Sequence, residues 1–257
     1  MSVKKILFFA GLLCVGSFAN INAAETTLSD TYKTDVELSQ GYRRDSLNLK
    51  VGGHKQHFKH VNEYTTRVGA TVRNNNDYFL KGIIGYGDVY SGKVGHSNHH
   101  KVKGDYTADF QVTFGKDMRM SDGWSVSPTV GYGVYIQDFH TRHSHGKVKG
   151  TWYSPQAGLS VAKSFNDNLS AYATYMCLFP LNFQASVRHG KTYENKAYKS
   201  VGNIGTIGVN WMFASNWSLK PEIEVMKFYS KTANQHNSHK DTERSSVEYR
   251  LVLGYMF

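Results

Sequence analysis

The C-terminal stretch Val247-Glu248-Tyr249-Arg250-Leu251-Val252-Leu253-Gly254-Tyr255-Met256-Phe257 decides the fold. Every second residue from Val247 to Phe257 is apolar or aromatic, and the positions between them hold Glu248, Arg250, Val252, Gly254 and Met256. A period of two indicates a β-strand whose two faces meet different surroundings. The same alternation recurs at 105–114, 124–136 and 169–183. The sequence therefore predicts a chain of many strands, each with one apolar face.

Ten such segments follow one another along the chain. They cover roughly residues 33–50, 58–73, 77–91, 105–119, 123–139, 150–164, 168–187, 200–214, 217–231 and 244–257. Most of these segments exceed the usual strand length of about five or six residues. Their long apolar faces carry Tyr, Trp and Phe near the ends, which is typical of a membrane barrel whose lipid-facing and lumen-facing residues alternate. The predicted fold is all-β: a ten-stranded antiparallel transmembrane β-barrel.

The connections between these segments alternate in length. Four are tight and rich in turn-forming residues: 74–76, 120–122, 165–167 and 214–216. Five are long, at about 51–57, 92–104, 140–149, 188–199 and 232–243. Short turns of outer-membrane barrels face the periplasm and long loops face outward. We expect both ends of the barrel chain on the periplasmic side.

The N-terminal residues predict export. Lys4 and Lys5 precede an apolar run at 6–19 and small residues up to Ala24, so residues 1–24 are expected to be a cleaved signal peptide and 25–257 the barrel. Without the two lysines, 28 of the 30 basic residues remain against 20 acidic ones, a net charge of +8. Cys177 is the one cysteine after the leader. Phe257 resembles the terminal signal recognised by the barrel assembly machinery, so the expected location is the outer membrane of a Gram-negative bacterium.

Histidine and lysine gather in the predicted long loops. Two nearly identical phrases, HHKVKGDY from His99 and HGKVKGTW from His145, each lead into a strand. We predict a basic, titratable outer rim. Its candidate residues are His54, His57, His60, His96, His99, His100, Lys101, Lys103, His140, His143, His145, Lys147, Lys149, His189, His236 and His239.

Three interpretations of this rim stay open. Histidines gain charge below about pH 6.5, which would make the rim more positive in acid. The His-Xaa-Xaa-His spacings at 54–60 could hold zinc, copper or nickel, but no carboxylate or cysteine completes a ligand set. The loops could also contact lipopolysaccharide phosphates. No metal and no cofactor are predicted.

Charged residues also fall on the predicted lumen face. Their positions along each strand, which alternate with the apolar residues, predict that ten of them face the lumen: Glu37, Arg67, Lys81, Asp105, Asp109, Lys220, Glu222, Glu224, Glu248 and Arg250. Because both signs are present, paired charges are expected. A barrel of this size is close to the one whose side chains fill the interior. The lumen is therefore either plugged by ion pairs or crossed by a narrow, charge-selective path.

Three segments carry a family resemblance: GYRRDSLNLKV at 41–51, LKGIIGYGDVYSGKV at 80–94 and WSLKPEIEV at 217–225. With ten strands, five long loops and a terminal Phe, the chain resembles the omptin-like outer-membrane barrels and, in general terms, the small porins. Omptins are surface endoproteases that use an aspartate pair in the second loop and an Asp–His pair in the fourth. The second loop here has no Asp-Xaa-Asp, and the fourth offers His189 and Glu194 but no Asp-Xaa-His. The sequence Asp138-Phe139-His140 enters the third loop instead, so no catalytic residue is assigned.

The expected function is that of a non-enzymatic surface protein. The first hypothesis is a small porin-like channel whose basic rim concentrates anions at the mouth. The alternatives are an adhesin that binds anionic glycans or lipopolysaccharide through its loops, and an omptin-like protease with an altered site. Expected partners are outer-membrane lipid and lipopolysaccharide, the assembly machinery through Phe257, and anionic solutes or host glycans. No nucleic-acid partner is expected.

Overall fold

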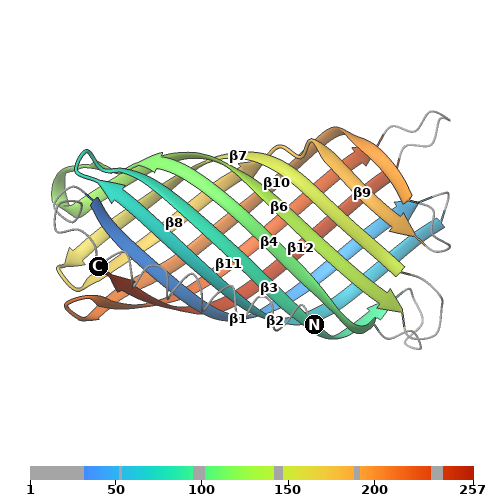
Figure 1. Ribbon diagram of the computed structural model, residues 1–257, viewed down its shortest axis with the longest axis horizontal. Coiled ribbons are helices and arrows are strands. Elements are labelled where there is room, and N and C mark those ends of the chain that lie inside the picture. The colour runs from blue at the N-terminus through green and yellow to red at the C-terminus, as the bar shows by residue number, and fades with distance from the viewer. Residues whose placement is uncertain (1–31, 52–53, 95–101, 142–146, 188–191, 233–239) are drawn as a thin grey trace, which may run out of the picture.

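The protein is an antiparallel β-barrel (Figure 1). The computed structural model describes residues 32–51, 54–94, 102–141, 147–187, 192–232 and 240–257. Its strands are β1 (Tyr32–Val51), β2 (His54–Asn74), β3 (Tyr78–Val94), β4 (Val102–Lys116), β5 (Met118–Arg119), β6 (Trp124–Thr141), β7 (Lys147–Asn166), β8 (Leu169–Leu178), β9 (Asn182–Val187), β10 (Thr192–Ala214), β11 (Trp217–Thr232) and β12 (Lys240–Met256).

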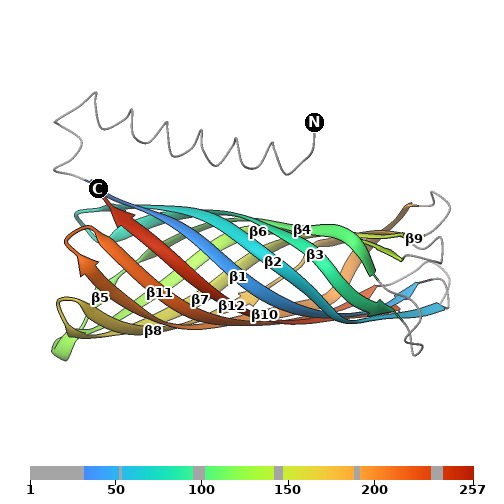
Figure 2. The same cartoon turned by 90° about the horizontal axis from the view of Figure 1, so that it is seen from below.

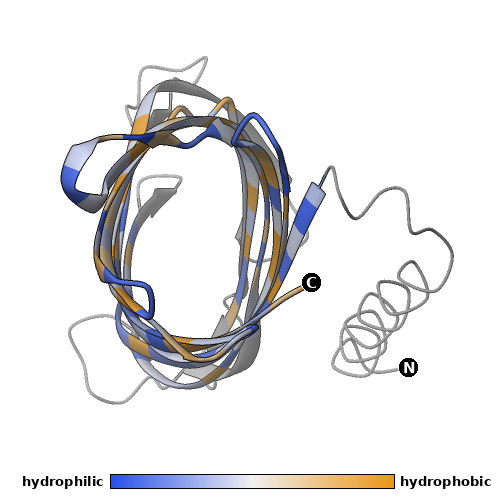
Figure 3. Ribbon diagram, turned by 90° about the vertical axis from the view of Figure 1, so that its left-hand side faces the viewer, coloured by the Kyte–Doolittle hydropathy of each residue, from blue (hydrophilic) through white to orange (hydrophobic). Residues whose placement is uncertain are grey.

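The twelve labelled strands make up the ten strands of one closed barrel. Short β5 extends β4 along β6, and β8 and β9 together lie between β7 and β10. Closure comes from pairing of β1 with β12, with β6 also paired to β7. Seen along its axis in Figure 3, the barrel is an oval ring. The predicted ten-stranded antiparallel barrel is confirmed. Residues 1–31 lie outside the described part, so the signal peptide stays a prediction.

The alternation that predicted the strands is visible in the burial of their side chains. On β12, Tyr249 and Leu251 leave about half of their surface exposed on the outer face, at 55% and 50%, whereas Glu248, the residue before Tyr249, is 2% exposed inside the barrel. A wall that is apolar outside and polar inside suits a lipid environment. The described ranges contain one short 3-10 helix, η1 (Ser121–Gly123), and no described helix is long and apolar enough to cross a membrane.

The two ends of the barrel differ. The short turns and Phe257 lie at one end, which we call the turn end; the other is the loop end (Figures 1 and 2). At the turn between β2 and β3, Asn74 Oδ1 accepts hydrogen bonds from the backbone N–H groups of Asn76 and Tyr78, both at 3.0 Å. Asp77 in this turn has a φ of 62°, a conformation that Asp and Asn tolerate. The predicted tight turn is therefore built by its own polar residues.

The strands run further toward the loop end than the sequence predicted. β2 begins at His54 rather than 58, β10 at Thr192 rather than 200, and β12 at Lys240 rather than 244. A membrane strand needs roughly 9–11 residues, yet β10 has 23. Hairpin pairing can continue in water because the ladder satisfies its own backbone groups. Residues expected in loops, among them His54, Lys103, His140, Lys147 and Lys149, therefore lie in strands at the loop end.

One predicted strand is divided. The segment 168–187 forms β8 and β9, separated at Pro180, which has no N–H to donate to a neighbour. Phe179 and Leu181 still donate to the carbonyls of Pro155 and Tyr153 on β7, both at 2.9 Å. Pairing with β10 jumps from Leu178 opposite Gly202 to Asn182 opposite Lys196, so β10 bulges across the break.

Near the loop end the wall separates between β3 and β4. Their pairing ends at Asp88 opposite Tyr106, and no described residue beyond this pair joins them, although β3 continues to Val94. Beyond that point β3 pairs with β2 on its other side, and β4 pairs with β6. The loop end is thus held partly by side chains packed across the interior, which are described next.

Candidate functional site

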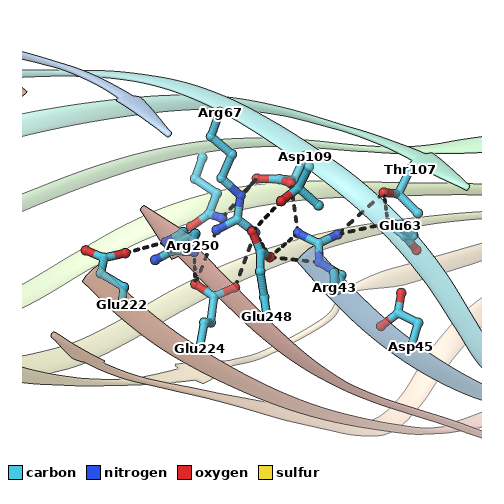
Figure 4. Close-up of polar contacts among 12 residues, drawn as sticks. Arg43, Asp45, Glu63, Arg67, Thr107, Asp109, Glu222, Glu224, Glu248 and Arg250 are labelled. Carbon is cyan, nitrogen blue, oxygen red and sulfur yellow. Dashed lines mark hydrogen bonds and ion pairs between the residues drawn. The ribbon is translucent and has the colours of Figure 1, made fainter. Parts of the chain in front are cut away.

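Charged side chains fill the middle of the barrel. Three guanidiniums, those of Arg43, Arg67 and Arg250, point inward from β1, β2 and β12 (Figure 4). Arg67 Nη2 lies 3.2 Å from Glu224 Oε1 and 3.1 Å from Glu248 Oε2. Since each arginine contacts more than one carboxylate, the groups form one connected network rather than separate pairs.

Arg43 and Arg250 extend this network in both directions. Arg43 Nη2 lies 2.7 Å from Glu248 Oε2, and its Nη1 lies 3.6 Å from Glu63 Oε2. Arg250 Nη1 lies 2.8 Å from Glu224 Oε2, and its Nε donates to Glu222. Nearer the loop end, Arg244 Nη2 pairs with Asp45 Oδ2 at 2.7 Å. We call the following set the lumen network: Arg43, Asp45, Glu63, Arg67, Asp109, Glu222, Glu224, Arg244, Glu248 and Arg250.

A second, smaller cluster lies toward the turn end. Glu37 receives Lys81 Nζ at 2.8 Å on Oε2 and Lys220 Nζ at 2.6 Å on Oε1. These three residues, which we call the lower triad, come from β1, β3 and β11. All eight lumen charges predicted as site residues therefore lie inside, in the lumen network or the lower triad; the side chain of Asp105 lies outside the described part.

Small residues open the space that the network occupies. A methyl group added at Gly85 would overlap the Asp109 carboxylate, and one added at Gly87 would overlap Thr107 and Glu63. Both glycines lie on β3, between strands that carry the long charged side chains. Because Gly87 has no side chain, Thr107 on β4 can reach past β3 to Glu63 on β2. Thr107 Oγ1 donates a hydrogen bond to Glu63 Oε2 at 2.6 Å.

An apolar core lies on the loop-end side of the network. It is built mainly from Leu47, Phe58, Phe139, Trp152 and Phe228, each at most 4% exposed. Phe58 and Phe139 pack with ring centroids 5.7 Å apart, and Trp152 meets Phe228 at 5.6 Å. These contacts join β2 to β6 and β7 to β11 across the interior. They hold together the end of the barrel where β3 and β4 are not paired.

Little free volume is left inside. The cavity beside Glu37, Arg67 and Arg250 measures about 40 Å³, and the one beside Arg43, Thr107 and Asp109 about 10 Å³. A water molecule needs roughly 10–15 Å³. The described interior therefore holds isolated water-sized spaces between tightly paired charges.

Two of the predicted rim histidines can be placed with their side chains. His57 Nδ1 shares a 2.7 Å hydrogen bond with Asn48 Oδ1. His60 is exposed, has a φ of 53°, and accepts a hydrogen bond from Arg44 Nε at 3.0 Å on Nδ1. Lys59 and Lys93 are register partners on β2 and β3. Arg44, Lys59, His60 and Lys93 thus form an exposed cluster, which we call the basic patch.

The basic patch lies beyond the lipid-facing band. It adjoins a group of outward-facing tyrosines in which Tyr64 and Tyr90 stack at 4.7 Å and Tyr42 meets Tyr64 at 6.4 Å. Desolvation, and then the charges of Arg44, Lys93 and Lys59, lower the pKa of His60 from its usual range. No described carboxylate lies within ion-pair distance of Arg44, Lys59 or Lys93.

The remaining rim residues are described less fully. His54, Lys103, His140, Lys147 and Lys149 have placed backbones near the loop end, but their side chains are outside the described part. The same is true of the whole of His96, His99, His100, Lys101, His143, His145, His189, His236 and His239. The basic, titratable rim therefore stays a prediction, and only His57 and His60 of these histidines have described side chains.

Omptin-like chemistry finds little support among the described residues. Asp138, the acid of the Asp138-Phe139-His140 sequence, is buried, with 6% of its surface exposed. No group of three described His, Cys, Asp or Glu side chains is arranged to hold a metal ion.

Sequence parity could have found the residues that were missed. Arg43 and Asp45 have the same parity as Glu37, and Glu63 has the same parity as Arg67. They lie at the loop-end half of their strands, where the sequence analysis looked for rim chemistry rather than for a filled interior. Arg244, the first residue of the predicted segment 244–257, was not predicted to face inward, yet it is 3% exposed inside the barrel.

Comparison with solved structures supports the architecture. The outer-membrane protease OmpT from Escherichia coli superposes with a TM-score of 0.64 at 10% identity, covering 89% of this chain and 97% of that one. The translocator domain of the autotransporter NalP from Neisseria meningitidis gives a TM-score of 0.46 at 12% identity, covering 95% and 98%. At such identity the likeness to OmpT shows the fold alone.

Sequence comparison gives a family and a location. No curated protein matches the chain. The family model described as Protochlamydia outer membrane protein matches residues 37–251, which is nearly all of the barrel. The protein is thus an outer-membrane β-barrel, and the chain belongs to the Protochlamydia outer membrane protein family.

Proposed function

We propose that this barrel is a surface binding protein whose outer end captures phosphate- or sulfate-bearing glycans, lipopolysaccharide among them. The basic patch is the observation that carries this proposal. Four basic side chains on three adjacent strands gather without a described carboxylate partner, and Lys59 directly faces Lys93. Like charges placed opposite each other across strands are destabilising. A bound anion would remove that cost.

The height of the patch suits the headgroups of the outer leaflet. Tyrosines mark the membrane–water interface of outer-membrane barrels, and the patch follows directly after Tyr42, Tyr64 and Tyr90 on the side of the loop end. Phosphate groups of a glycolipid in the outer leaflet lie at this level. Arg44 can present a planar fork to phosphate oxygens, and the lysines can act as point charges.

The filled interior favours binding over passage. Ions crossing the barrel would have to break the lumen network and then part the apolar core, since the two cavities described among these charges measure about 40 Å³ and 10 Å³. The porin-like channel remains a second candidate because the lumen is polar and each arginine has several carboxylates within reach. Such an exchange of ion pairs is the rearrangement a channel would require.

We propose no catalytic activity for the described part of the chain. A general acid or base must reach the proton that it transfers. Asp138 faces buried surroundings, and the described carboxylates of the lumen network are occupied by arginines. Peptide cleavage that is lost on replacing Asp138 would contradict this assignment.

The test measures glycan binding by the barrel reconstituted in detergent micelles. Lys59→Gln combined with Lys93→Gln removes two charges; at about 1 kcal/mol per charge near an anionic surface, affinity for lipopolysaccharide should fall about 30-fold. Arg119→Gln is the matched control, because Arg119 is exposed at the turn end with a side-chain exposure of 78%. Dephosphorylated lipopolysaccharide and heparin separate lipid phosphate from host sulfate as the ligand. Equal binding by the double variant and the wild type would refute the patch.

A further inference from the structure

Two carboxylates of the lumen network are completely buried and only half satisfied. Asp45 on β1 and Glu63 on β2 are both 0% exposed. Asp45 Oδ1 and Glu63 Oε1 have no hydrogen-bond partner, although the second oxygen of each is bonded. A buried polar atom without a partner costs free energy comparable to a lost hydrogen bond, and a buried charge costs more. Binding of a cation or a proton would therefore stabilise these two unpaired oxygens.

The charge of the network points to a positive ligand. The lumen network holds six carboxylates (Asp45, Glu63, Asp109, Glu222, Glu224, Glu248) against four guanidiniums (Arg43, Arg67, Arg244, Arg250). The lower triad has two lysines and one carboxylate, so it adds one positive charge. With this charge included, carboxylates still outnumber cations among these residues. An uncompensated carboxylate is not stable in such surroundings. Either a cation or a proton must balance it.

The surroundings suit a proton better than a metal ion. Leu47, Phe58, Val61 and Val89 pack on the loop-end side of the pair and offer no side-chain oxygen. Calcium and magnesium require about six or more oxygen ligands. In the described part of the chain no group of three acidic, histidine or cysteine side chains meets even a minimal requirement. Neither Asp45 nor Glu63 lines the 10 Å³ cavity next to Arg43.

We propose that Glu63 binds a proton at neutral pH, so that it carries no negative charge next to Asp45. The proton adds to a carboxylate to give a neutral acid, so no other reactant is needed. Of the two carboxylates, Asp45 has the closer guanidinium, because Arg244 approaches its Oδ2 to 2.7 Å. Glu63 has a hydroxyl partner, Thr107, and a guanidinium only at 3.6 Å. Two neighbouring buried carboxylates share one proton for the same reason in other proteins.

The groups that surround Asp45 and Glu63 come from several strands. β1 contributes Arg43 and Asp45, β4 contributes Thr107, and β12 contributes Arg244. From β6, Gln137 lies against Asp45 and Arg244, and the buried Asp138 follows it. β3 contributes Gly87 and Val89, which carry no charge. Among the described residues, the two nearby guanidiniums pair most closely elsewhere: Arg43 with Glu248 and Arg244 with Asp45, both at 2.7 Å.

The two carboxylates connect β1 and β2 to other strands at the loop end of the barrel. Glu63 bonds Thr107 on β4, and Asp45 bonds Arg244, whose guanidinium lies 5.9 Å from the Trp152 ring on β7. Loss of the proton would leave two buried like charges on the adjacent strands β1 and β2. Folding takes up this proton, so the folded state should lose stability as pH rises above the ordinary titration range of glutamate.

The test uses three variants of the refolded barrel in lipid vesicles. Glu63→Gln keeps the shape and imitates the neutral acid. Asp45→Asn removes the neighbouring negative charge, so Glu63 should ionise. Glu243→Gln is the control, because Glu243 is partly exposed on β12 and pairs with Lys227 at 3.6 Å. Urea unfolding from about pH 5 to about pH 9 gives the folding equilibrium constant at each pH, and infrared spectroscopy detects the C=O band of a buried carboxylic acid.

For wild type and Glu243→Gln we expect the infrared band at neutral pH. Their folding constant should fall by up to about tenfold per pH unit over the range where the folded state keeps a proton that the unfolded state has lost. Glu63→Gln and Asp45→Asn should both lose the band, and Glu63→Gln should flatten the pH dependence. If the wild type shows no such band, or if Glu63→Gln leaves the pH dependence unchanged, the proton site is refuted. The infrared result on the wild type stands even where a variant fails to fold.

Discussion

Replacing Arg67 by Met should destabilise the barrel more than any surface charge replacement. The Met side chain keeps the apolar stem but removes a guanidinium that lies 3.1 Å from Glu248, 3.2 Å from Glu224 and 3.6 Å from Asp109. Breaking a buried ion pair by removing one partner costs about 3–5 kcal/mol.

The surrounding contacts place the loss at the lower end of that range. Glu224 keeps Arg250 at 2.8 Å and Glu248 keeps Arg43 at 2.7 Å, whereas Asp109 is left with Arg43 at 3.8 Å. We therefore expect the free energy of unfolding to fall by about 3 kcal/mol, which is about 150-fold in the folding equilibrium constant.

Urea titration in lipid vesicles, followed by tryptophan fluorescence, measures this loss. Arg119→Met is the control: its partner Asp77 lies 3.2 Å away at the exposed turn end, where an ion pair contributes at most about 1 kcal/mol. Adding Asp109→Asn to Arg67→Met should recover about 1 kcal/mol, because the least compensated carboxylate is then neutral. Equal stability of Arg67→Met and Arg119→Met would show that the lumen network does not hold the barrel together.

Three further predictions address other parts of the molecule. Gly85→Ala should cost about 1–3 kcal/mol because its methyl overlaps Asp109, whereas Gly82→Ala on the same strand meets nothing within 4 Å and should be neutral in the same unfolding assay. Nuclear magnetic resonance should find the pKa of His60 below about 6.5, and Arg44→Gln should raise it. Since this pKa is lowered by folding, protonation of His60 in acid should weaken the fold. Phe58→Ala should cost about 3–5 kcal/mol of unfolding free energy and enhance fluorescence quenching of the buried tryptophan.

The architecture could be predicted because alternation reports directly on a two-sided wall. The final strand shows this best: Tyr249 and Leu251 face outward and Glu248 faces inward, as their spacing requires. Strand ends were less predictable. The lipid band stops where the apolar alternation stops, but backbone pairing continues beyond it, as β10 shows from Thr192 onward.

The interior could be predicted only in part. The alternation of residues predicted that Arg67 and Glu224 face the lumen. It gives no information on which strands lie opposite each other, and these two residues, which form a hydrogen bond, are 157 positions apart in the sequence. Contacts of this kind, between side chains from distant parts of the sequence, determine whether the lumen is open or filled. The burial of Arg244 and Asp45 was missed because polar residues near a predicted loop look solvated until the strands around them are seen to continue.

The rim was predicted from composition, which fixes residue types but not their neighbours. His57 and His60, the two predicted rim histidines with described side chains, meet Asn48 and Arg44 rather than each other. Their spacing suggested a metal site, but consecutive positions on a strand alternate faces, and the positive φ of His60 changes the local register. The basic patch arises from pairing between β2 and β3, which spacing within one strand cannot reveal.

Current recording across a planar lipid bilayer tests most directly whether the lumen is filled. The barrel should first be shown to be folded by its β-sheet circular dichroism and its resistance to unfolding in detergent. With the lumen network and the apolar core intact, we predict a silent membrane at neutral pH. Stable, uniform single-channel steps from the folded wild type would contradict a filled barrel and return the porin-like channel to first place.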